Sequence, residues 1–497
     1  MSSLEEIREE RLKKKKVLEG AGVNPYPAEC SRTHEISDII NHMADLLESQ
    51  AVVRLTGRVM ALRRHGGSAF IDLFDGTTRL QCFISRDKIG EDSYKLFIDS
   101  VDIGDFIECV GSMITTRRET YALSLTEWKM LTKSLQAIPS EHFGLKDDDE
   151  RYRKRHLDLL LNDELRDLFI KKARFWQTIR NFMIEHGFLE VETPYLEVTT
   201  GGAEARPFMT YHNDYDMDVY LRISIGELWQ KRLMAAGYPK TFEIGRAFRN
   251  EGTSPEHLQE FTNLEFYWAY ANYRDGMKLV RELYQKIGLE VFGTTKFSAH
   301  GHEFDLANEW VEIDYAEEVE RQTGVDIFVA SEEEIKSKLA ELNVKYDGDT
   351  RERLIDTLWK YCRKSITGPA FLINHPITVA PLAKARADGK TVEMFQPIIA
   401  GSEVGRGYSE LNDPIDQKQR FEIQQQLIER GDDEAMMPDW EFVEMLEHGM
   451  PPTCGFGFGE RLFAFLAGKP IRETQLFPLM KPREKDVSER GAEVSGE

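Results

Sequence analysis

Residues 51–131 constrain the fold most, because five short strand-like runs follow one another there and one helix-like stretch interrupts them. The runs are rich in Val, Ile, Thr and Phe, and glycine-containing turns such as Gly66-Gly67 and Asp75-Gly76 separate them. The strand-like runs cover 51–62, 68–74, 79–85, 105–115 and 121–131, and the helix-like stretch covers 87–101. Five short strands with a helix after the third predict a small β-barrel.

This element order is that of the OB-fold, a barrel that binds oligonucleotides on one face. The whole chain has 64 Lys and Arg against 86 Asp and Glu, and this net charge of −22 excludes a protein that simply coats nucleic acid. Residues 51–90 differ, with seven basic and three acidic side chains. Phe70 follows a small-residue loop and is expected at the surface, where it could stack on an unpaired base. Phe74 and Phe83 are expected to fill the barrel.

The chain of 497 residues is too long for one compact domain. We expect an N-terminal helical extension at 1–50, the barrel domain at 51–139 and a polar linker at 140–155. A larger α+β domain should follow at 156–482, with a helical insertion at about 314–365, and a polar tail at 483–497.

The five cysteines lie far apart in the sequence, which argues against a disulfide framework and against a zinc knuckle. The N-terminal residues lack the apolar segment of a signal peptide, and no run approaches the ~18 apolar residues of a membrane span. We therefore expect a soluble, cytoplasmic protein.

The densest group of chemically capable side chains lies at 241–265, where an alternating strand enters a Gly/Ser/Pro loop and a second alternating strand follows. Arg249 and Glu251 are expected to share one face of this hairpin. Arg249 could bind a phosphate bidentately, Glu251 and His257 could contact a base or phosphates, and Phe261 could stack on a purine. A surface hairpin held by salt bridges is the alternative.

Two glycine-rich segments complete the candidate site. In 401–412, Glu403 and Glu410 suit a magnesium ligand and a carboxylate that binds a cation. In 451–466, alternating glycines let a strand pass close to a flat ligand, and Arg461 should face the same cleft. The chain has no Walker A sequence, no GxGxxG fingerprint and no nucleophile elbow.

Taken together, these segments resemble the class II aminoacyl-tRNA synthetases, and among them the lysyl-tRNA synthetases. The three motifs of the class match 187–194, 242–265 and 455–461. The lysine subfamily is indicated by the segments at 24–27, 156–160, 201–208, 226–233 and 408–413. The resemblance covers nearly the whole chain, from about residue 5 to 482.

The resemblance implies an OB-fold anticodon-binding domain, followed by a catalytic domain with a six-stranded antiparallel sheet flanked by helices. It implies a homodimer that uses ATP and Mg²⁺ to convert L-lysine to lysyl-adenylate and then transfers the lysyl group to tRNA(Lys). Neither step needs an enzymic nucleophile, so the protein positions the reactants and stabilises the developing charge.

The resemblance also implies roles for individual residues. Arg249 would hold the α-phosphate and Arg461 the γ-phosphate or the opposite adenine face, and both would be catalytic. The other ATP contacts would be Glu251, His257 and Phe261. The lysine pocket would be lined by Gly202, Glu227, Glu265, Tyr267, Tyr408 and Glu410. Magnesium would bind Glu403, with Gln396 and Glu410 as further candidates. The anticodon would be read by Arg63, Phe70, Gln81 and Glu127.

The chain departs from the family pattern at four places. Gln396 stands where the family has its second magnesium carboxylate, and Arg406 stands where Asn is usual. The loop sequence at 256–259 differs from the usual Arg-His-Asn-Pro, and the third motif is one residue shorter. Gln396 and Arg406 bear on the metal site and on the choice of amino acid.

Three alternatives remain open. Arg406 and the altered loop motivate a synthetase for aspartate or asparagine. A protein-modifying lysyltransferase is disfavoured by the barrel at 51–131, which such relatives lack. A non-catalytic RNA-binding relative is disfavoured by the retained Arg249, Glu251 and Arg461.

Overall fold

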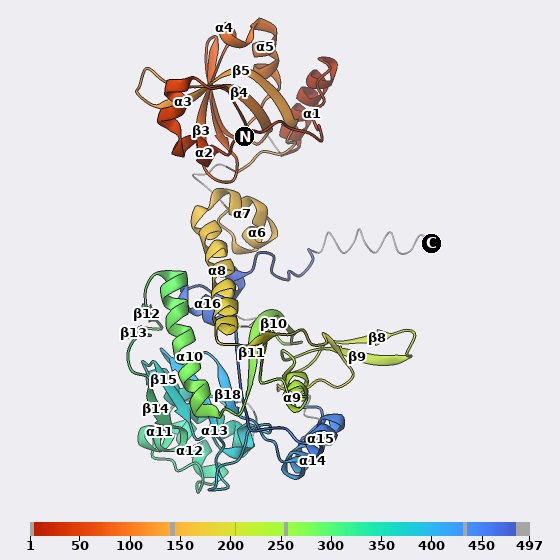
Figure 1. The fold of residues 1–497 in the computed structure, drawn as a ribbon, viewed down its shortest axis with the longest axis vertical. Coiled ribbons are helices and arrows are strands. Elements are labelled where there is room, and N and C mark those ends of the chain that lie inside the picture. The colour runs from red at the N-terminus through yellow and green to blue at the C-terminus, as the bar shows by residue number, and fades with distance from the viewer. Residues whose placement is uncertain are drawn as a thin grey trace. The chain divides into compact units, whose positions relative to one another are not determined.

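A computed structural model describes residues 4–139, 145–203, 205–252, 257–346, 348, 350–430 and 435–483. The chain divides into two compact units, Met1–Arg151 and Tyr152–Glu497 (Figure 1). Residues 140–144 of the expected linker and 484–497 of the expected tail lie outside the described residues. None of the helices in the described part combines the length and the apolar character that a membrane span needs.

The first unit contains a closed five-stranded barrel, which confirms the predicted OB-fold. Its strands follow the order β1-β2-β3-β5-β4, with two short helices between β3 and β4. Their bounds are β1 Val53–His65, β2 Ser68–Phe74, β3 Arg79–Ser85, α4 Arg86–Ile89, α5 Glu91–Ser100, β4 Phe106–Thr115 and β5 Tyr121–Thr132. Val, Ile and Leu side chains alternate into the interior, so the apolar period of two specifies the barrel core.

The expectation that Phe74 and Phe83 fill the barrel is wrong. Along β3 the buried positions are Leu80, Cys82 and Ile84, so Phe83 points outward between two of them. The outward side chains of Phe70 and Phe83 are directly opposite in the β2–β3 ladder, with ring centroids 5.0 Å apart. Strand alternation decides the direction of each side chain here, and large aromatic size does not.

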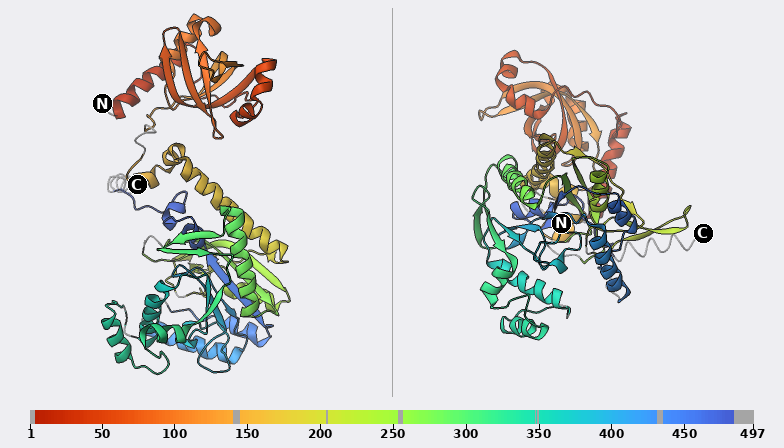
Figure 2. Two further views of the ribbon diagram at one scale, coloured as in Figure 1. Left: turned by 90° about the vertical axis from the view of Figure 1, so that its left-hand side faces the viewer. Right: turned by 60° about the horizontal axis from the view of Figure 1, so that its bottom comes forward.

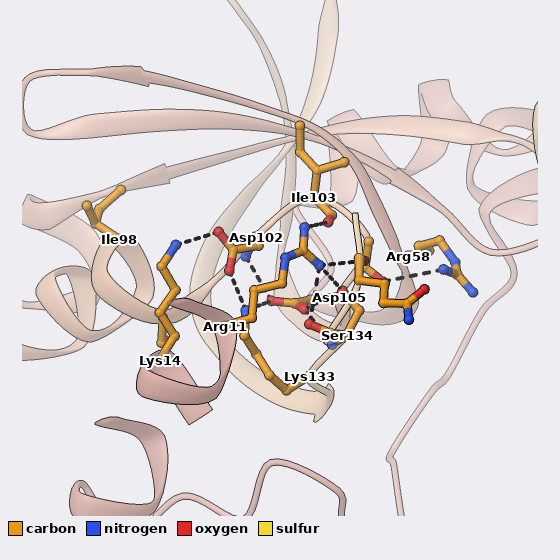
Figure 3. Close-up of polar contacts among 12 residues, drawn as sticks. Arg11, Lys14, Arg58, Ile98, Asp102, Ile103, Asp105, Lys133 and Ser134 are labelled. Carbon is orange, nitrogen blue, oxygen red and sulfur yellow. Dashed lines mark hydrogen bonds and ion pairs between the residues drawn. The ribbon is translucent and has the colours of Figure 1, made fainter. Parts of the chain in front are cut away.

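Helix α1, Leu4–Gly20, is attached to the barrel by a cluster of polar side chains (Figure 3). The Arg11 guanidinium donates to the backbone oxygens of Ile103, Ser134 and Gln136. The Lys133 ammonium donates to Asp102 at 2.6 Å and to Asp105 at 2.8 Å, and Lys133 and Asp105 are almost completely buried. Buried charges persist only when they are paired and hydrogen-bonded.

Burial in this cluster would by itself raise the pKa of Asp102. Hydrogen bonds from Lys133 and Lys14 outweigh it and hold the pKa below its usual value. The N-terminal extension also contains α2 Ile36–Asn41 and α3 Met43–Ser49.

The expected linker is helical in part. Helix α6, Asp148–Arg153, lies within 140–155, and its first turn contains Asp148, Asp149 and Glu150. Acidic side chains favour the N-terminus of a helix because of the helix dipole. A polar sequence without apolar period therefore did not exclude a helix here.

The second unit is built on one large sheet in the order β14-β15-β16-β18-β19-β11-β10-β6, with β17 beside β16. The six strands from β15 to β10 are antiparallel, as the resemblance implies, and parallel strands extend the sheet at both edges. The bounds are β6 Leu189–Glu190, β10 Lys240–Phe248, β11 Glu260–Ala269, β14 Val311–Asp314, β15 Ala370–Ile373, β16 Met394–Ile399, β17 Ser402–Glu403, β18 Arg406–Ser409 and β19 Thr453–Gly459.

The long helices α8, Asp163–Glu185, and α10, Tyr273–Ile287, cover one face of this sheet (Figures 1 and 2). Along β11, Leu264 and Phe266 pack into the core beneath these helices, and the alternating Glu265 and Tyr267 point to the opposite face. That opposite face carries the candidate site.

The remaining elements surround this framework. Three helices occupy the expected insertion and share a core of their own, α11 Tyr315–Thr323, α12 Glu332–Glu341 and α13 Arg351–Cys362. Three other helices pack beside the site, α9 Glu227–Ala235, α14 Pro414–Glu429 and α15 Trp440–Glu447. Smaller elements are α7 Arg155–Leu161, η1 Gly288–Phe292, η2 Arg363–Ser365, η3 Ile377–Val379, α16 Arg461–Leu466 and η4 Ile471–Thr474, the sheet of β7 Leu196–Glu197, β8 Met209–His212 and β9 Met217–Leu221, and the hairpin of β12 Lys296–Ala299 and β13 His302–Asp305.

Candidate active site

A buried ammonium group lies between two carboxylates at the centre of the site. Lys231 Nζ is 2.5 Å from Glu410 Oε2 and 3.1 Å from Glu227 Oε1, and all three residues are buried. Glu227 begins helix α9, Lys231 lies one turn later, and Glu410 follows β18. The Tyr408 hydroxyl also donates to Glu227. Segments about 180 residues apart in sequence therefore meet at one ammonium.

Two glycines allow the backbone to approach these carboxylates. A Cβ atom on Gly455 of β19 would lie 2.1 Å from Glu410 Oε1. Gly202 has a φ of +86°, and a Cβ there would lie 2.7 Å from Glu227 Oε2. Any larger residue at these two positions would displace a carboxylate.

The third carboxylate, Glu265, is held by β11. Its Oε1 accepts from the Ile225 backbone N–H at 2.8 Å, and its Oε2 accepts from the Tyr267 hydroxyl at 3.2 Å. Burial and then repulsion from Glu227 raise the pKa of Glu265 to about 7, although these hydrogen bonds oppose the rise. Burial also raises the pKa of Glu410 to about 8, despite the adjacent Lys231 ammonium.

The three carboxylates and the two glycines line one cavity of about 280 Å³. The six residues predicted for the lysine pocket all contribute to it, and so do two arginines. The lining includes Gly202, Glu227, Arg249, Glu265, Tyr267, Arg406, Tyr408, Glu410 and Gly455. The structure thus brings the predicted lysine-binding residues together, and their role stays a prediction.

Arg249 lies in the segment after β10, so the expectation that strand alternation places Arg249 and Glu251 on one face is wrong. β10 ends at Phe248, and the Glu251 backbone N–H donates to the Arg249 oxygen in a tight turn. The Arg249 guanidinium lies over the Phe261 ring, 5.2 Å from its centroid, and its Nε donates to the Ile223 oxygen at 3.3 Å. Burial lowers the pKa of Arg249.

The other predicted ATP residues do not line this cavity. Arg461 is the first residue of α16 and lines a second cavity of about 410 Å³, together with His300 and Ser402. His257 is exposed, and residues 253–256 before it lie outside the described residues. Their roles in ATP binding stay predictions.

The candidate metal residues differ in how well they suit a cation. Glu403 is partly exposed, and its Oε1 accepts from the Trp359 indole N–H at 2.6 Å, so it retains a second oxygen for a ligand. Gln396 is buried, and its amide oxygen accepts from His375 Nε2 at 2.8 Å. Glu410 is paired with Lys231. Within the described residues, no group of three His, Cys, Asp or Glu is arranged to hold a metal.

Lys231 and His375 contact this site but were not predicted from the sequence. Glu227 and Lys231 have the i, i+4 spacing of a helical ion pair, which was an available signal for Lys231. His375 follows β15, and no local pattern indicates that it meets Gln396 of β16.

The barrel brings most of the predicted anticodon residues onto one outer face. Arg63 is paired with Phe70 in the β1–β2 ladder, and Asp72 is paired with Gln81 in the β2–β3 ladder. Arg63 donates to both carboxylate oxygens of Asp72, at 3.0 and 2.7 Å. Glu127 is instead exposed on β5, with its carboxylate 3.8 Å from the Arg54 guanidinium.

The chain is similar to known proteins over nearly its whole length. A family described as "tRNA synthetases class II (D, K and N)" matches residues 147–481, and an "OB-fold nucleic acid binding domain" matches 53–131. A lysine–tRNA ligase of Thermotoga maritima is 40% identical and is aligned over 99% of both chains. Lysine–tRNA ligases of Thermosipho africanus and Roseiflexus castenholzii are also 40% identical, over 96–97% of this chain and 97–100% of theirs.

Replacing Lys231 with Met should destabilise the protein in a pH-dependent way. The change leaves Glu227 and Glu410 buried without a cation, which costs about 3–5 kcal/mol when both are ionised. A carboxyl group with a raised folded-state pKa destabilises the fold increasingly as the pH rises above its unfolded value of about 4.3. Scanning calorimetry should therefore show a larger loss relative to wild type at pH 8 than at pH 5.5.

Lys286→Met is the matched control, because Lys286 forms a partly exposed ion pair with Glu185 at 2.7 Å. It should change stability by less than about 1 kcal/mol at either pH. A loss for Lys231→Met that is equal at the two pH values would contradict the charge assignment.

Proposed function

The chain belongs to the class II tRNA synthetases, and from this premise we infer that it joins L-lysine to tRNA(Lys) through a lysyl-adenylate, at the expense of ATP. Lysine is the amino acid named for its full-length relatives. The family description also covers aspartate and asparagine enzymes, so the pocket chemistry bears on the choice of amino acid.

The observation that carries the choice of lysine is the charge around Lys231. Glu227 and Glu410 share one ammonium, so ionisation of both carboxyl groups leaves one negative charge that Lys231 does not neutralise. Glu265 adds a third carboxylate to the same cavity. A ligand ammonium would compensate this charge, whereas the side-chain carboxylate of aspartate would be repelled.

We propose that the cavity positions the two reactants of the first step. The lysine carboxylate attacks the α-phosphate of ATP, pyrophosphate leaves, and lysyl-adenylate remains. Arg249 lines the same cavity as Glu265. From there its guanidinium stabilises the negative charge that develops on the α-phosphate. A hydroxyl at the tRNA 3′ end then attacks the lysyl carbonyl and AMP leaves.

Phe261 is proposed to stack on adenine, and Arg461 to hold the γ-phosphate or the opposite adenine face. Glu251 and His257 are proposed to contact ATP. Phe261 is half-buried on β11, and the planar guanidinium of Arg249 lies over its ring. The face of this ring can therefore stack against a flat group such as a base.

Magnesium is proposed to bind at Glu403. Mg²⁺ is usually held by one or two carboxylates together with substrate phosphates, and Glu403 supplies one such carboxylate. When bound, the ion neutralises charge on the ATP phosphates. The neutral amide of Gln396, with its oxygen bonded to His375, does not fit a second metal site.

The barrel is proposed to read the anticodon with Arg63, Phe70 and Gln81, and with Glu127 at its edge. The ring pair of Phe70 and Phe83 offers an aromatic surface, and aromatic surfaces bind unpaired bases. We place the activity in the cytoplasm, where all five cysteines would remain free thiols, as they are in the structure. Cell fractionation would test that location.

Glu410→Gln should abolish lysine-dependent ATP–pyrophosphate exchange. The change removes a buried charge partner of the ligand ammonium, an effect of several kcal/mol, and leaves the residues proposed for ATP in place. Wild-type protein should support exchange with lysine and with no other of the twenty amino acids. ATP binding, measured by calorimetry, should persist in the variant.

The exposed Glu441 of α15 supplies the control, and Glu441→Gln should exchange like wild type. Wild-type-like exchange by Glu410→Gln would refute the pocket assignment. Exchange that depends on aspartate or asparagine would refute the choice of lysine.

Phe70→Ala should leave lysine-dependent exchange intact and slow only the charging of tRNA. Loss of one stacked base costs about 1–3 kcal/mol, which corresponds to roughly a 5- to 150-fold rise in the KM for tRNA. The control is Tyr121→Ala, because Tyr121 is exposed at the start of β5, outside the patch of Arg63, Phe70 and Gln81. An equal loss of exchange and charging would contradict the division of labour between the two units.

We also propose that the chain forms a homodimer through the segment around 187–194. Exposed apolar side chains gather in and beside this segment, at Ile184, Leu189, Leu196 and Val198. Sedimentation velocity should show a species of two 57.4 kDa chains. Leu196→Asp should shift it toward the monomer, whereas Val329→Asp, at an exposed site on the insertion, should not.

A further inference from the structure

Gln396 and Arg406, the two departures from the family pattern, are neighbours in the structure. Met394 of β16 is paired with Tyr408 of β18, and Phe395 with Gly407. The ladder ends at that second pair, and Gln396 and Arg406 are the next residues beyond it on the two strands. Residues two apart on a strand point to the same face, so both side chains leave the sheet on the side of Tyr408, which lines the active-site cavity.

Gln396 is not available to a cation. Its amide oxygen accepts the hydrogen bond from His375, and both side chains are buried. The place of the family's second magnesium carboxylate therefore holds an uncharged amide whose oxygen is already hydrogen-bonded to His375.

Among the described residues, no carboxylate lies within ion-pair distance of Arg406. Arg406 is exposed and lines the cavity that Arg249 and Glu265 also line. Burial, with a smaller contribution from the charge of Arg406, lowers the pKa of Arg249. Arg406 and the arginine proposed to hold the α-phosphate line the same cavity.

Together, the two departures make the site more positive, by an amount equal to the charge of one magnesium ion. A carboxylate replaced by Gln396 removes one negative charge, and an amide replaced by Arg406 adds one positive charge. We propose that Arg406 replaces the second magnesium ion, and that its guanidinium binds the ATP phosphates that such an ion would neutralise. Guanidinium groups suit this task because they bind phosphate oxygens bidentately. The proposal rests on the proposed function.

The first test counts metal ions on the full-length protein. Mn²⁺ is titrated into protein saturated with lysine and a non-hydrolysable α,β-methylene analogue of ATP, and free Mn²⁺ is measured by electron paramagnetic resonance. We expect one Mn²⁺ fewer per bound nucleotide in wild type than in the double variant Gln396→Glu/Arg406→Asn. Equal numbers in the two proteins would overturn the proposal.

The second test uses only the exposed position, because a charge at buried Gln396 can prevent folding. Arg406→Asn should weaken binding of the ATP analogue by about 10- to 100-fold, the effect of one lost charge-assisted contact. Lysine affinity should change by less than about twofold, within the ±0.5 kcal/mol of a neutral substitution. A loss of lysine affinity alone would overturn the proposal, because Arg406 would then serve the amino acid.

Arg321→Asn is the matched control, since Arg321 is an exposed arginine of α11 that pairs with Glu318. It should bind the analogue like wild type. Lysine-dependent exchange by wild type is measured separately. If wild type activates another amino acid, the proposed function fails, and the metal count, repeated with that amino acid, still decides the role of Arg406.

Discussion

The ion pair between Lys231 and Glu410 ties the site to the fold. It joins the first turns of α9 to the end of β18, and Glu227 and Tyr408 complete it from the same two elements. A buried charge without its partner costs several kcal/mol, so α9 and the sheet are stable together only in an arrangement that forms the whole cluster. The glycine at 455 is part of this constraint, because β19 must pass within contact of the Glu410 carboxylate.

The carboxylates of this cluster contribute to the negative net charge of the chain. The acidic surplus is useful at a pocket for a cationic amino acid, where three glutamates line one cavity. Anion binding is instead proposed for a few arginines, Arg249 and Arg406 in the cavity and Arg63 on the barrel. A protein of net charge −22 can bind tRNA in this way, although its attraction for the polyanion is local and sensitive to salt.

Local pattern predicted the barrel well and the connections poorly. The strands β2 and β3 have the bounds expected from alternation and turn residues, because each residue's environment there repeats every two positions. The same rule failed for Arg249 and Glu251, since β10 ends at Phe248 and the turn that follows is set by hydrogen bonds to the returning chain. Phe83 was expected inside the barrel, but the alternation on β3 points it outward.

The sequence by itself determined the fold class and the six pocket positions, because strand period, turn glycines and the resemblance are all carried by short segments. Tertiary structure alone decided which charges meet. Lys231 faces Glu410 and His375 faces Gln396 across 179 and 21 positions of sequence, respectively, and nothing in either local segment specifies the partner. Charge compensation depends on distance in space, and that distance is set only when β16, β18 and α9 pack around one cavity.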